Sequence, residues 1–148
     1  MHTMNPADMK LEHHMCFHLY AASKEVIRCY KPFLDPLDLT YTQYLALLVL
    51  WEQGTVSVKE LGEKLYLDSG TMTPVLKKLE SKGFVTRQRS TADERNLVVT
   101  ITESGEALKD KAVTVQAEIA KCSNLEPDEA AMLYRILYKM LGKKELYE

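Results

Sequence analysis

The sequence has few cysteines, no long apolar run and little net charge. Its 148 residues contain three cysteines, Cys16, Cys29 and Cys122, too few and too widely spaced for a secreted disulfide scaffold or a C-x-x-C zinc site. The longest apolar run, Tyr44 to Trp51, has eight residues, against the roughly 18 that a membrane span needs. The first ten residues lack the apolar segment of a signal peptide, so we expect a cytoplasmic protein without a membrane partner.

Charge is distributed unevenly, although the net value is only −2. Residues 69–95 hold six Lys and Arg against three Asp and Glu, which gives +3. Residues 1–68 (six against nine) and 96–148 (seven against nine) carry −3 and −2. A basic centre between acidic flanks is typical of a small DNA-contacting element on an acidic scaffold, although an ordinary solvated face gives the same pattern.

The helix signals predict a mainly α-helical chain. A first helix is expected over about residues 8–33, ended by Pro32 and the proline that follows. The pair Thr40 and Gln43 has capping-box spacing ahead of an apolar helix. Thr102 is placed to cap a long fifth helix, and a last helix follows Pro127.

Two short helices within and just before the basic centre form a helix-turn-helix candidate. The capping box Ser57–Glu60 opens the first. The second has apolar residues at i, i+3, i+4 and i+7, namely Met72, Val75, Leu76 and Leu79. Pro74 requires this helix to begin near Thr71, so that the missing N–H falls in the first turn.

A hairpin after the helix-turn-helix predicts a winged helix. Residues 84–89 and 96–102 have the composition of two strands, joined by a polar loop, so a two-stranded wing is expected. We expect a single domain over residues 1–148, with the winged helix-turn-helix at about 40–102.

The helices on either side, at about 1–39 and 103–148, are predicted to form a dimerisation region. Their apolar faces are more extensive than so small a domain can cover by itself. A homodimer is therefore expected.

The predicted DNA contacts are small polar residues at the start of the second helix and charged residues beside it. They are Ser69, Gly70, Thr71, Thr73, Pro74, Lys77, Lys78, Arg87, Asp93 and Arg95. Small side chains at a helix N-terminus reach base edges in the major groove, and Lys77, Lys78 and Lys82 are suited to phosphates. Arg95 at the hairpin tip is suited to a narrow minor groove, with Asp93 positioning a basic neighbour. The alternative is that these are solvated surface charges.

These motifs resemble a known family. The segments that carry the resemblance are 61–65, 77–83, 93–95 (Asp-Glu-Arg) and 97–105, which ends in Thr-Glu-Ser-Gly. Together they are similar to the MarR family of dimeric winged-helix repressors, over essentially the whole chain. The segment Leu67–Pro74 is further similar to the branch of organic-hydroperoxide-resistance regulators (OhrR), which sense peroxides through a cysteine thiol.

The resemblance implies a redox-sensing cysteine in the first helix, held by tyrosines of the other subunit. Cys16 matches that position, and the spacing of Tyr30 and Tyr41 from it resembles that of the branch. Tyr20 lies four residues from Cys16 on the same helix face. Phenol O–H groups can stabilise a thiolate without adding a countercharge. The helix dipole is expected to add little, because Cys16 lies about two turns inside a helix that begins near residue 8.

The resemblance also suggests a partner for oxidised Cys16. Some members of the branch have a resolving cysteine at the position of Cys122, which forms a disulfide with the sensor of the other subunit, whereas other members lack it. Cys29 is about 20 Å from Cys16 along one helix, so it is interpreted as structural. The expected function is a repressor that releases double-stranded operator DNA when an organic hydroperoxide oxidises Cys16.

Three alternatives remain. A repressor of the same fold could bind a phenolic or aromatic ligand, with Cys16 incidental. His14 and His18 have the i, i+4 spacing of a helical metal site, although no further ligand completes it. A thiol peroxidase using Cys16 is the third. We expect neither a cofactor nor a metal, and no enzymatic activity.

Overall fold

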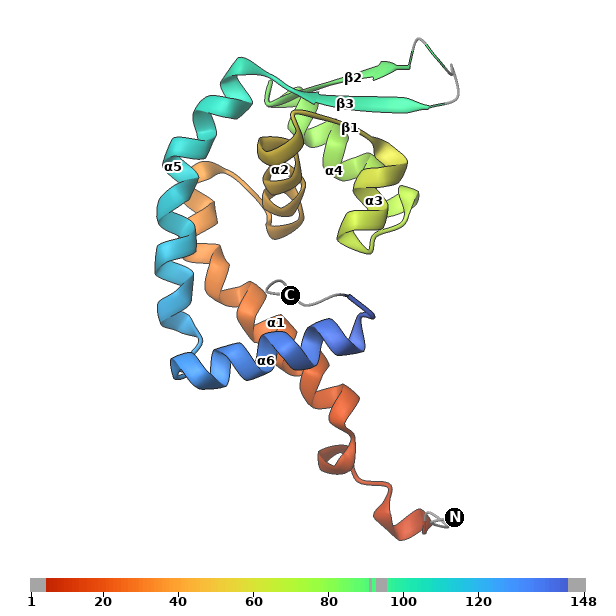
Figure 1. The fold of residues 1–148 in the computed structure, drawn as a ribbon, viewed down its shortest axis with the longest axis vertical. Coiled ribbons are helices and arrows are strands. Elements are labelled where there is room, and N and C mark those ends of the chain that lie inside the picture. The colour runs from red at the N-terminus through yellow and green to blue at the C-terminus, as the bar shows by residue number, and fades with distance from the viewer. Residues whose placement is uncertain (1–4, 91, 93–95, 144–148) are drawn as a thin grey trace.

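The computed structural model describes residues 5–90, 92 and 96–143, and these form six α-helices and three short strands (Figure 1). The helices are α1 (Met15–Leu34), α2 (Tyr41–Gln53), α3 (Val58–Leu65), α4 (Ser69–Ser81), α5 (Glu103–Ile119) and α6 (Pro127–Met140). The strands are β1 (Thr55–Ser57), β2 (Val85–Arg89) and β3 (Leu97–Ile101). The predicted mainly α-helical class is confirmed.

The prediction of a first helix from about residue 8 is wrong at its N-terminal end. Two short 3-10 turns, Pro6–Asp8 and Leu11–His13, precede α1, which begins at Met15. The cause is local, because side chains here bond backbone groups that a continuous helix would use. The ring Nδ1 of His14 lies 2.7 Å from the Lys10 carbonyl oxygen. At its other end α1 continues through its proline to residue 34.

The helix α2 is the centre of the core. The predicted capping box is present: the Thr40 hydroxyl accepts from the Gln43 backbone N–H at 3.3 Å, and the Gln43 side chain accepts from the Thr40 N–H at 3.1 Å. Its most buried apolar side chains, each at most 4% exposed, are Tyr44, Ala46, Leu47 and Leu50. In Figure 1 it lies between α5 on one side and α3 and α4 on the other, and it packs against all three.

The strands form one antiparallel sheet in the order β1-β3-β2. The hairpin was predicted, and its register pairs Val85 with Ile101. The third strand β1 was not predicted; it pairs Thr55 with Thr100 on the other edge of β3. Because β1 has only three residues, its strand conformation depends on a partner more than 40 residues away and not on a local pattern.

The helix α4 begins two residues earlier than Thr71, the start that the sequence suggested. Asp68 caps it at Ser69, and its carboxylate accepts from the Thr71 N–H at 2.7 Å. Pro74 therefore lies inside the helix, where it cannot donate to the carbonyl of Gly70. The predicted apolar face is confirmed, since Met72, Leu76 and Leu79 are fully buried.

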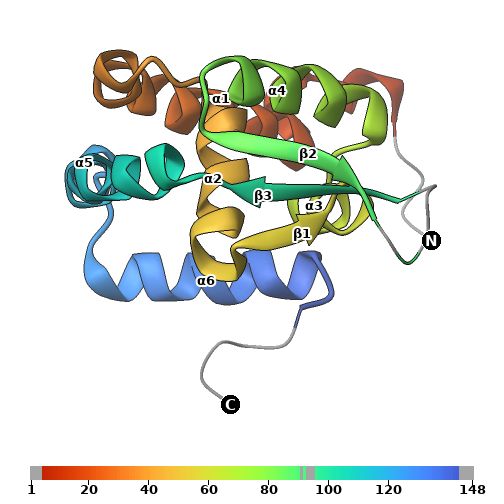
Figure 2. The ribbon, with the colours of Figure 1, turned by 90° about the horizontal axis from the view of Figure 1, so that it is seen from above.

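The helices α1, α5 and α6 extend away from the sheet and α2–α4 (Figures 1 and 2). The first two pack together, whereas α6 has no buried residue in the single chain. Apolar side chains on α1 and α6 that are 42% to 52% exposed include Val26, Ile27, Met132, Leu133, Ile136 and Met140. Such faces are what dimerisation helices offer a second subunit. Within the described part of the chain, no helix has the length and hydropathy to cross a bilayer.

Candidate thiol site and nucleic-acid interface

Cys16 is exposed and is the second residue of α1. The prediction that it lies two turns inside a helix is wrong, because α1 begins at Met15. In the first turn the backbone N–H groups have no helical partner, and the helix carries a partial positive charge there. No acidic side chain lies in that turn. Cys16 therefore lies at the positive end of the α1 dipole.

Tyr20 lies one turn after Cys16 and is 59% exposed. The ammonium group of Lys24 lies 5.1 Å from the centre of its ring, a cation-π contact on the same helix. Tyr20 thus stands on the exposed face that Cys16 also presents.

The two other predicted tyrosines belong to an aromatic cluster that joins α1 to α2. The ring of Tyr30 lies 4.8 Å from that of Tyr41 and 5.8 Å from that of Tyr44, measured between centroids. Burial, and then the neighbouring phenols of Tyr41, Tyr44 and Tyr134, raise the pKa of Tyr30 to about 12. Burial also raises the pKa of Tyr41 and of Tyr44. These phenols therefore keep their protons at neutral pH and remain hydrogen-bond donors.

Tyr44 was not predicted as part of this cluster. It begins the longest apolar run of the sequence, and it is only 4% exposed. Its position three residues after Tyr41 was the available signal, because residues at i and i+3 are neighbours on a helix. The edge of its ring also contacts Trp51, with the centroids 6.3 Å apart.

Cys16 cannot reach this cluster within its own chain. Tyr30 lies 14 residues further along the same helix, which corresponds to about 21 Å. The N-terminal half of α1 extends beyond the rest of the subunit (Figure 1). Only a second subunit could bring the Cys16 thiol and a tyrosine cluster together.

The other two cysteines, Cys29 and Cys122, interact within one chain. Cys29 on α1 is half-buried, and Cys122 in the 3-10 turn Ala120–Cys122 after α5 is exposed. Interaction with the Cys29 thiol, and then burial, raise the pKa of Cys122, and the Glu118 carboxylate adds to the effect. No local pattern predicts this interaction, because the two residues belong to elements far apart in the chain.

The start of α4 presents the small polar side chains that the sequence predicted to contact DNA. The exposed residues of the predicted set on this helix are Ser69, Gly70, Thr71, Thr73, Pro74, Lys77 and Lys78. The hydroxyl of Thr73 donates to the Ser69 carbonyl at 2.8 Å, which leaves its oxygen free to accept from a base. Asp93 and Arg95, the predicted contacts in the wing, lie outside the described residues.

Two of the predicted basic residues are engaged inside the fold. Arg87 Nη2 lies 3.1 Å from one Glu80 carboxylate oxygen, and the Arg87 backbone N–H donates to the other at 3.1 Å. These bonds hold the pKa of Glu80 below its usual value. Lys82 pairs with the Asp38 carboxylate at 3.5 Å and donates to the Asp38 carbonyl. Arg87 therefore ties β2 to α4, and its contact with DNA stays a prediction.

The base of the wing is hydrogen-bonded to the first turn of α5 at Gly105. The hydroxyl of Thr102 donates to the Gly83 carbonyl at 2.6 Å and accepts from the Gly105 N–H at 3.1 Å. The indole of Trp51 donates to the Gly105 carbonyl at 2.9 Å. The Thr-x-x-Gly segment noted in the sequence thus joins three elements, β3, α5 and α2.

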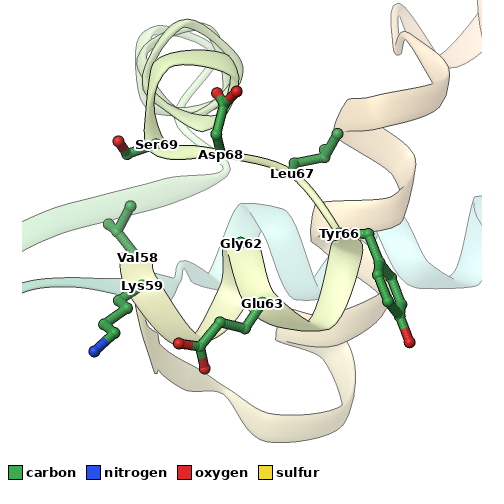
Figure 3. Close-up of a pocket in the computed structure, with 8 residues that line it drawn as sticks. All are labelled: Val58, Lys59, Gly62, Glu63, Tyr66, Leu67, Asp68 and Ser69. Carbon is green, nitrogen blue, oxygen red and sulfur yellow. The ribbon is translucent and has the colours of Figure 1, made fainter. Parts of the chain in front are cut away.

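An open cavity of about 680 Å³ lies beside the turn between α3 and α4 (Figure 3). Residues of both helices and of the turn line it: Val58, Lys59, Gly62, Glu63, Tyr66, Leu67, Asp68 and Ser69. Backbone and hydroxyl hydrogen bonds from Thr71 lower the pKa of Asp68, so the cap is charged at neutral pH. The cavity leaves the first turn of α4 accessible from outside.

The histidine pair before and within α1 is engaged with the backbone. The ring of His14 bonds the Lys10 carbonyl, and His18 Nε2 lies 2.9 Å from the Glu12 carbonyl oxygen. These contacts fold the segment that precedes α1. Across the described ranges, no three His, Cys, Asp or Glu side chains gather as metal ligands.

Comparison with known proteins identifies the family. The sequence pattern of the MarR family matches residues 39–97. The chain is 50% identical, over 133 residues and 90% of each protein, to the organic hydroperoxide resistance transcriptional regulator of Bacillus subtilis. It is 41% identical, over 95% of its length and 96% of the relative, to the HTH-type transcriptional regulator SarZ of Staphylococcus saprophyticus.

Comparison with solved structures leads to the same family. A structure of reduced AbfR bound to DNA has a TM-score of 0.75 at 34% identity and covers 94% of this chain and 97% of that one. A structure of disulfide-formed AbfR has a TM-score of 0.62 at 33% identity and covers 92% of each chain. The winged helix-turn-helix fold is thereby confirmed, and the chain belongs to the MarR family of transcriptional regulators.

Proposed function

We propose that the chain acts as a cytoplasmic homodimeric repressor that holds operator DNA when reduced and releases it when an organic hydroperoxide oxidises Cys16. The observation that carries this proposal is the exposed Cys16 in the first turn of α1, on a segment that projects away from the rest of the chain (Figure 1). The name of the Bacillus subtilis relative supports this choice of oxidant. Members of the family are DNA-binding regulators and not enzymes, so a thiol peroxidase is no longer an alternative.

The first step is a two-electron oxidation of Cys16. Its thiolate attacks one peroxide oxygen, the O–O bond breaks, and the alcohol leaves after taking a proton, so that Cys16 becomes a sulfenic acid. Before the reaction, neutral phenols at Tyr30 and Tyr41 of the other subunit donate hydrogen bonds to the thiolate, with Tyr20 beside it on its own helix. The positive end of α1 stabilises the same anion. Adding an oxygen to the sulfur disrupts this arrangement.

The second step is a disulfide between subunits. The thiol of Cys122 attacks the sulfenic sulfur of Cys16 in the partner subunit, an S–S bond forms and water leaves. Cys122 is exposed in the single chain, as this reaction requires. Solved structures of AbfR in a reduced DNA-bound state and in a disulfide-formed state support a switch of this kind.

DNA binding is assigned to α4 and the wing. The start of α4 enters the major groove, where Thr73 and its small neighbours meet base edges, while Lys77 and Lys78 contact phosphates. Arg95 reaches the minor groove from the wing, and Asp93 positions it. A dimer of this type binds two half-sites about 34–36 Å apart, so the operator is expected to be pseudo-palindromic.

The test is a DNA-binding titration by fluorescence anisotropy with cumene hydroperoxide, on the wild type and on Cys16→Ser. We expect the oxidant to release the wild-type protein, whereas Cys16→Ser binds DNA and stays bound. Equal release of the two proteins would overturn the sensor assignment and favour a non-covalent ligand.

The disulfide has its own test. Non-reducing gels taken early after oxidation should contain a covalent dimer in the wild type and none in Cys122→Ser. If both run as monomers while the Cys16 requirement holds, the sulfenic acid alone releases DNA.

A further inference from the structure

Lys82 caps the C-terminal end of α4, just before the turn that leads to the wing. Its side chain is only 24% exposed, although a lysine is seldom buried unless its charge is paired. Gly83 follows in the left-handed conformation, with φ at 81°, and β2 begins at Val85. The sequence grouped Lys82 with Lys77 and Lys78 as suited to phosphates, but only those two are exposed on the surface of α4.

Three oxygen atoms surround the Lys82 ammonium group. It donates to the backbone carbonyl of Asp38 and, at 3.2 Å, to the side-chain Oε1 of Gln43. A carboxylate oxygen of Asp38 lies 3.5 Å away. An ammonium group has three N–H donors, so these oxygens can engage all of them and leave none for a DNA phosphate. Because Gln43 is only 2% exposed, part of the contact is shielded from water, where a charged hydrogen bond is stronger.

The acceptors at Asp38 belong to the short segment that connects α1 to α2. The helix α1 ends at Leu34, and the 3-10 turn Asp35–Leu37 follows it. Asp38 closes this turn in the left-handed conformation, and its backbone N–H donates to the first carbonyl of the turn at 2.9 Å. The N–H of Leu39 donates back to the carbonyl of Leu34 at 3.2 Å. The segment is therefore fixed to the end of α1, and the lysine joins it to the end of α4.

We propose that Lys82 is a positioning residue for DNA reading, which holds α4 and the base of the wing in a fixed orientation to α1. In a dimer built on α1, this orientation sets the spacing of the two reading helices. The wing is included because the carbonyl of Gly83 accepts from the Thr102 hydroxyl at 2.6 Å. The proposal rests on the proposed function for the homodimer and for DNA contacts by α4.

A link at this point affects specific and non-specific DNA binding differently. Two half-sites about 34–36 Å apart must meet two α4 helices at once. If α4 turns relative to α1, the two half-sites can no longer be read together. Attraction to phosphates continues, because it depends on the exposed lysines and not on the register of the reading helices. Loss of Lys82 is therefore expected to reduce the preference for the operator and to leave non-specific binding unchanged.

The first experiment compares Lys82→Met with Lys78→Met in the full-length protein by fluorescence anisotropy. Lys78 is the matched control, because it lies one turn earlier on α4 and is exposed. The probes are a duplex that the wild type selects from random DNA, used as the operator, and a scrambled duplex of the same composition. We expect Lys82→Met to bind the operator about tenfold more weakly, as for one lost charge-assisted hydrogen bond. Its affinity for the scrambled duplex and its slope of log affinity against log salt should not change.

The control variant should behave in the opposite way. Lys78→Met should bind both duplexes more weakly and reduce the salt slope by about 1. A reduced slope in Lys82→Met would make Lys82 a phosphate contact and overturn the proposal. Unchanged operator binding by Lys82→Met would also overturn it, and α4 would remain the reading helix if Lys78→Met is weakened. Unchanged binding by both variants would count against the assignment of DNA contacts to α4 as well.

The second experiment measures the spacing of the reading helices. One base pair inserted between the half-sites moves one of them by about 3.4 Å and rotates it by about 35°. We expect the ratio of affinities for the original and the lengthened duplex to be smaller in Lys82→Met than in the wild type. A general loss of stability would lower both affinities by the same factor, so an unchanged ratio would overturn the proposal. Lys82→Gln serves as a second variant with the same expected result, and circular dichroism sets a temperature at which each protein is folded.

A double-mutant cycle tests the link itself. Asp38→Asn removes the charge of the carboxylate, and asparagine tolerates the left-handed backbone at this position. If Lys82 acts through Asp38, then Asp38→Asn should weaken operator binding in the wild type and add little to the effect of Lys82→Met. Costs that simply add would show that the two residues act independently, and the link would be overturned.

Discussion

Gly105 is the position where the wing meets α5 with no room for a side chain. It is buried, and a Cβ added there would lie 2.2 Å from the Phe84 carbonyl oxygen and 2.9 Å from Cγ1 of Ile101. The Phe84 oxygen is held in place because it accepts from the Thr102 N–H at 3.0 Å. The Gly105 carbonyl is in turn held by the indole of Trp51.

We therefore expect Gly105→Ala to lower the free energy of unfolding by about 2–3 kcal/mol, the upper part of the range for overpacking a buried position. For a chain of 148 residues, one kcal/mol corresponds to about 4 °C, so the melting temperature should fall by about 10 °C. Circular dichroism at a fixed protein concentration measures this, because the stability of a dimer depends on concentration. Operator affinity should fall as well, since the base of the wing is displaced.

Gly70→Ala is the matched control. An added Cβ there would meet only Asp68 Oδ1, at the ordinary distance of 3.4 Å. Alanine is favoured over glycine in a helix by up to about 1 kcal/mol, so the melting temperature should not fall. Operator affinity should still decrease, because the methyl group stands where the helix approaches the bases. If Gly105→Ala instead melts within about 2 °C of the wild type, the contact with the wing is not rigid and the reasoning is refuted.

Three further predictions concern charge. Glu80→Gln removes the ionic partner of Arg87. Because the fold lowers the pKa of Glu80, the ion pair stabilises the protein fully above the ordinary Glu pKa of 4.5, and this stabilisation is lost as the pH falls below that value. The difference in urea midpoint between wild type and variant should therefore be larger at neutral pH than in acid. Tyr30 has its pKa raised from 10.0 to about 12, so it contributes stability below pH 10 that is lost as pH rises toward 12. After allowance for the partial exposure of Tyr30, the free energy of unfolding measured in urea should fall by about 1 kcal/mol less in Tyr30→Phe than in the wild type over this pH range. Replacing Lys77 or Lys78 with Ala should reduce the slope of log affinity against log salt by about 1, and an unchanged slope would exclude that residue as a phosphate contact.

The parts of the fold that the sequence predicted depend on signals within a few residues. The capping box Thr40–Gln43, the cap at Thr102 and the start of the last helix at Pro127 are all confirmed. Each depends on residues at the start of a helix, whose types and spacing are visible in the sequence. The apolar face of α4 is periodic, and it was predicted for the same reason.

The features that were missed join residues far apart in the chain. The interaction of Cys29 with Cys122, the ion pair of Arg87 with Glu80 and the pairing of β1 with β3 depend on how helices and strands pack. Periodicity carries no information about such pairs. The start of α1 was misplaced for another reason, since the ring of His14 bonds the backbone of the preceding turn, an interaction that a helical pattern does not reveal.

A displacement of α1 would reach α4 through packed contacts and not through a flexible link. The rings of Tyr30, Tyr41 and Tyr44 join α1 to α2, and α2 packs against α4. On the other side α1 packs against α5, which is bonded at Gly105 to Trp51 of α2. Because close-packed interiors transmit strain, α2, α4 and α5 are expected to follow α1 together. Under the proposed function we therefore expect oxidation to release DNA by changing the spacing of two intact reading helices. Hydrogen exchange within α4 should then be equally slow in the reduced and oxidised proteins.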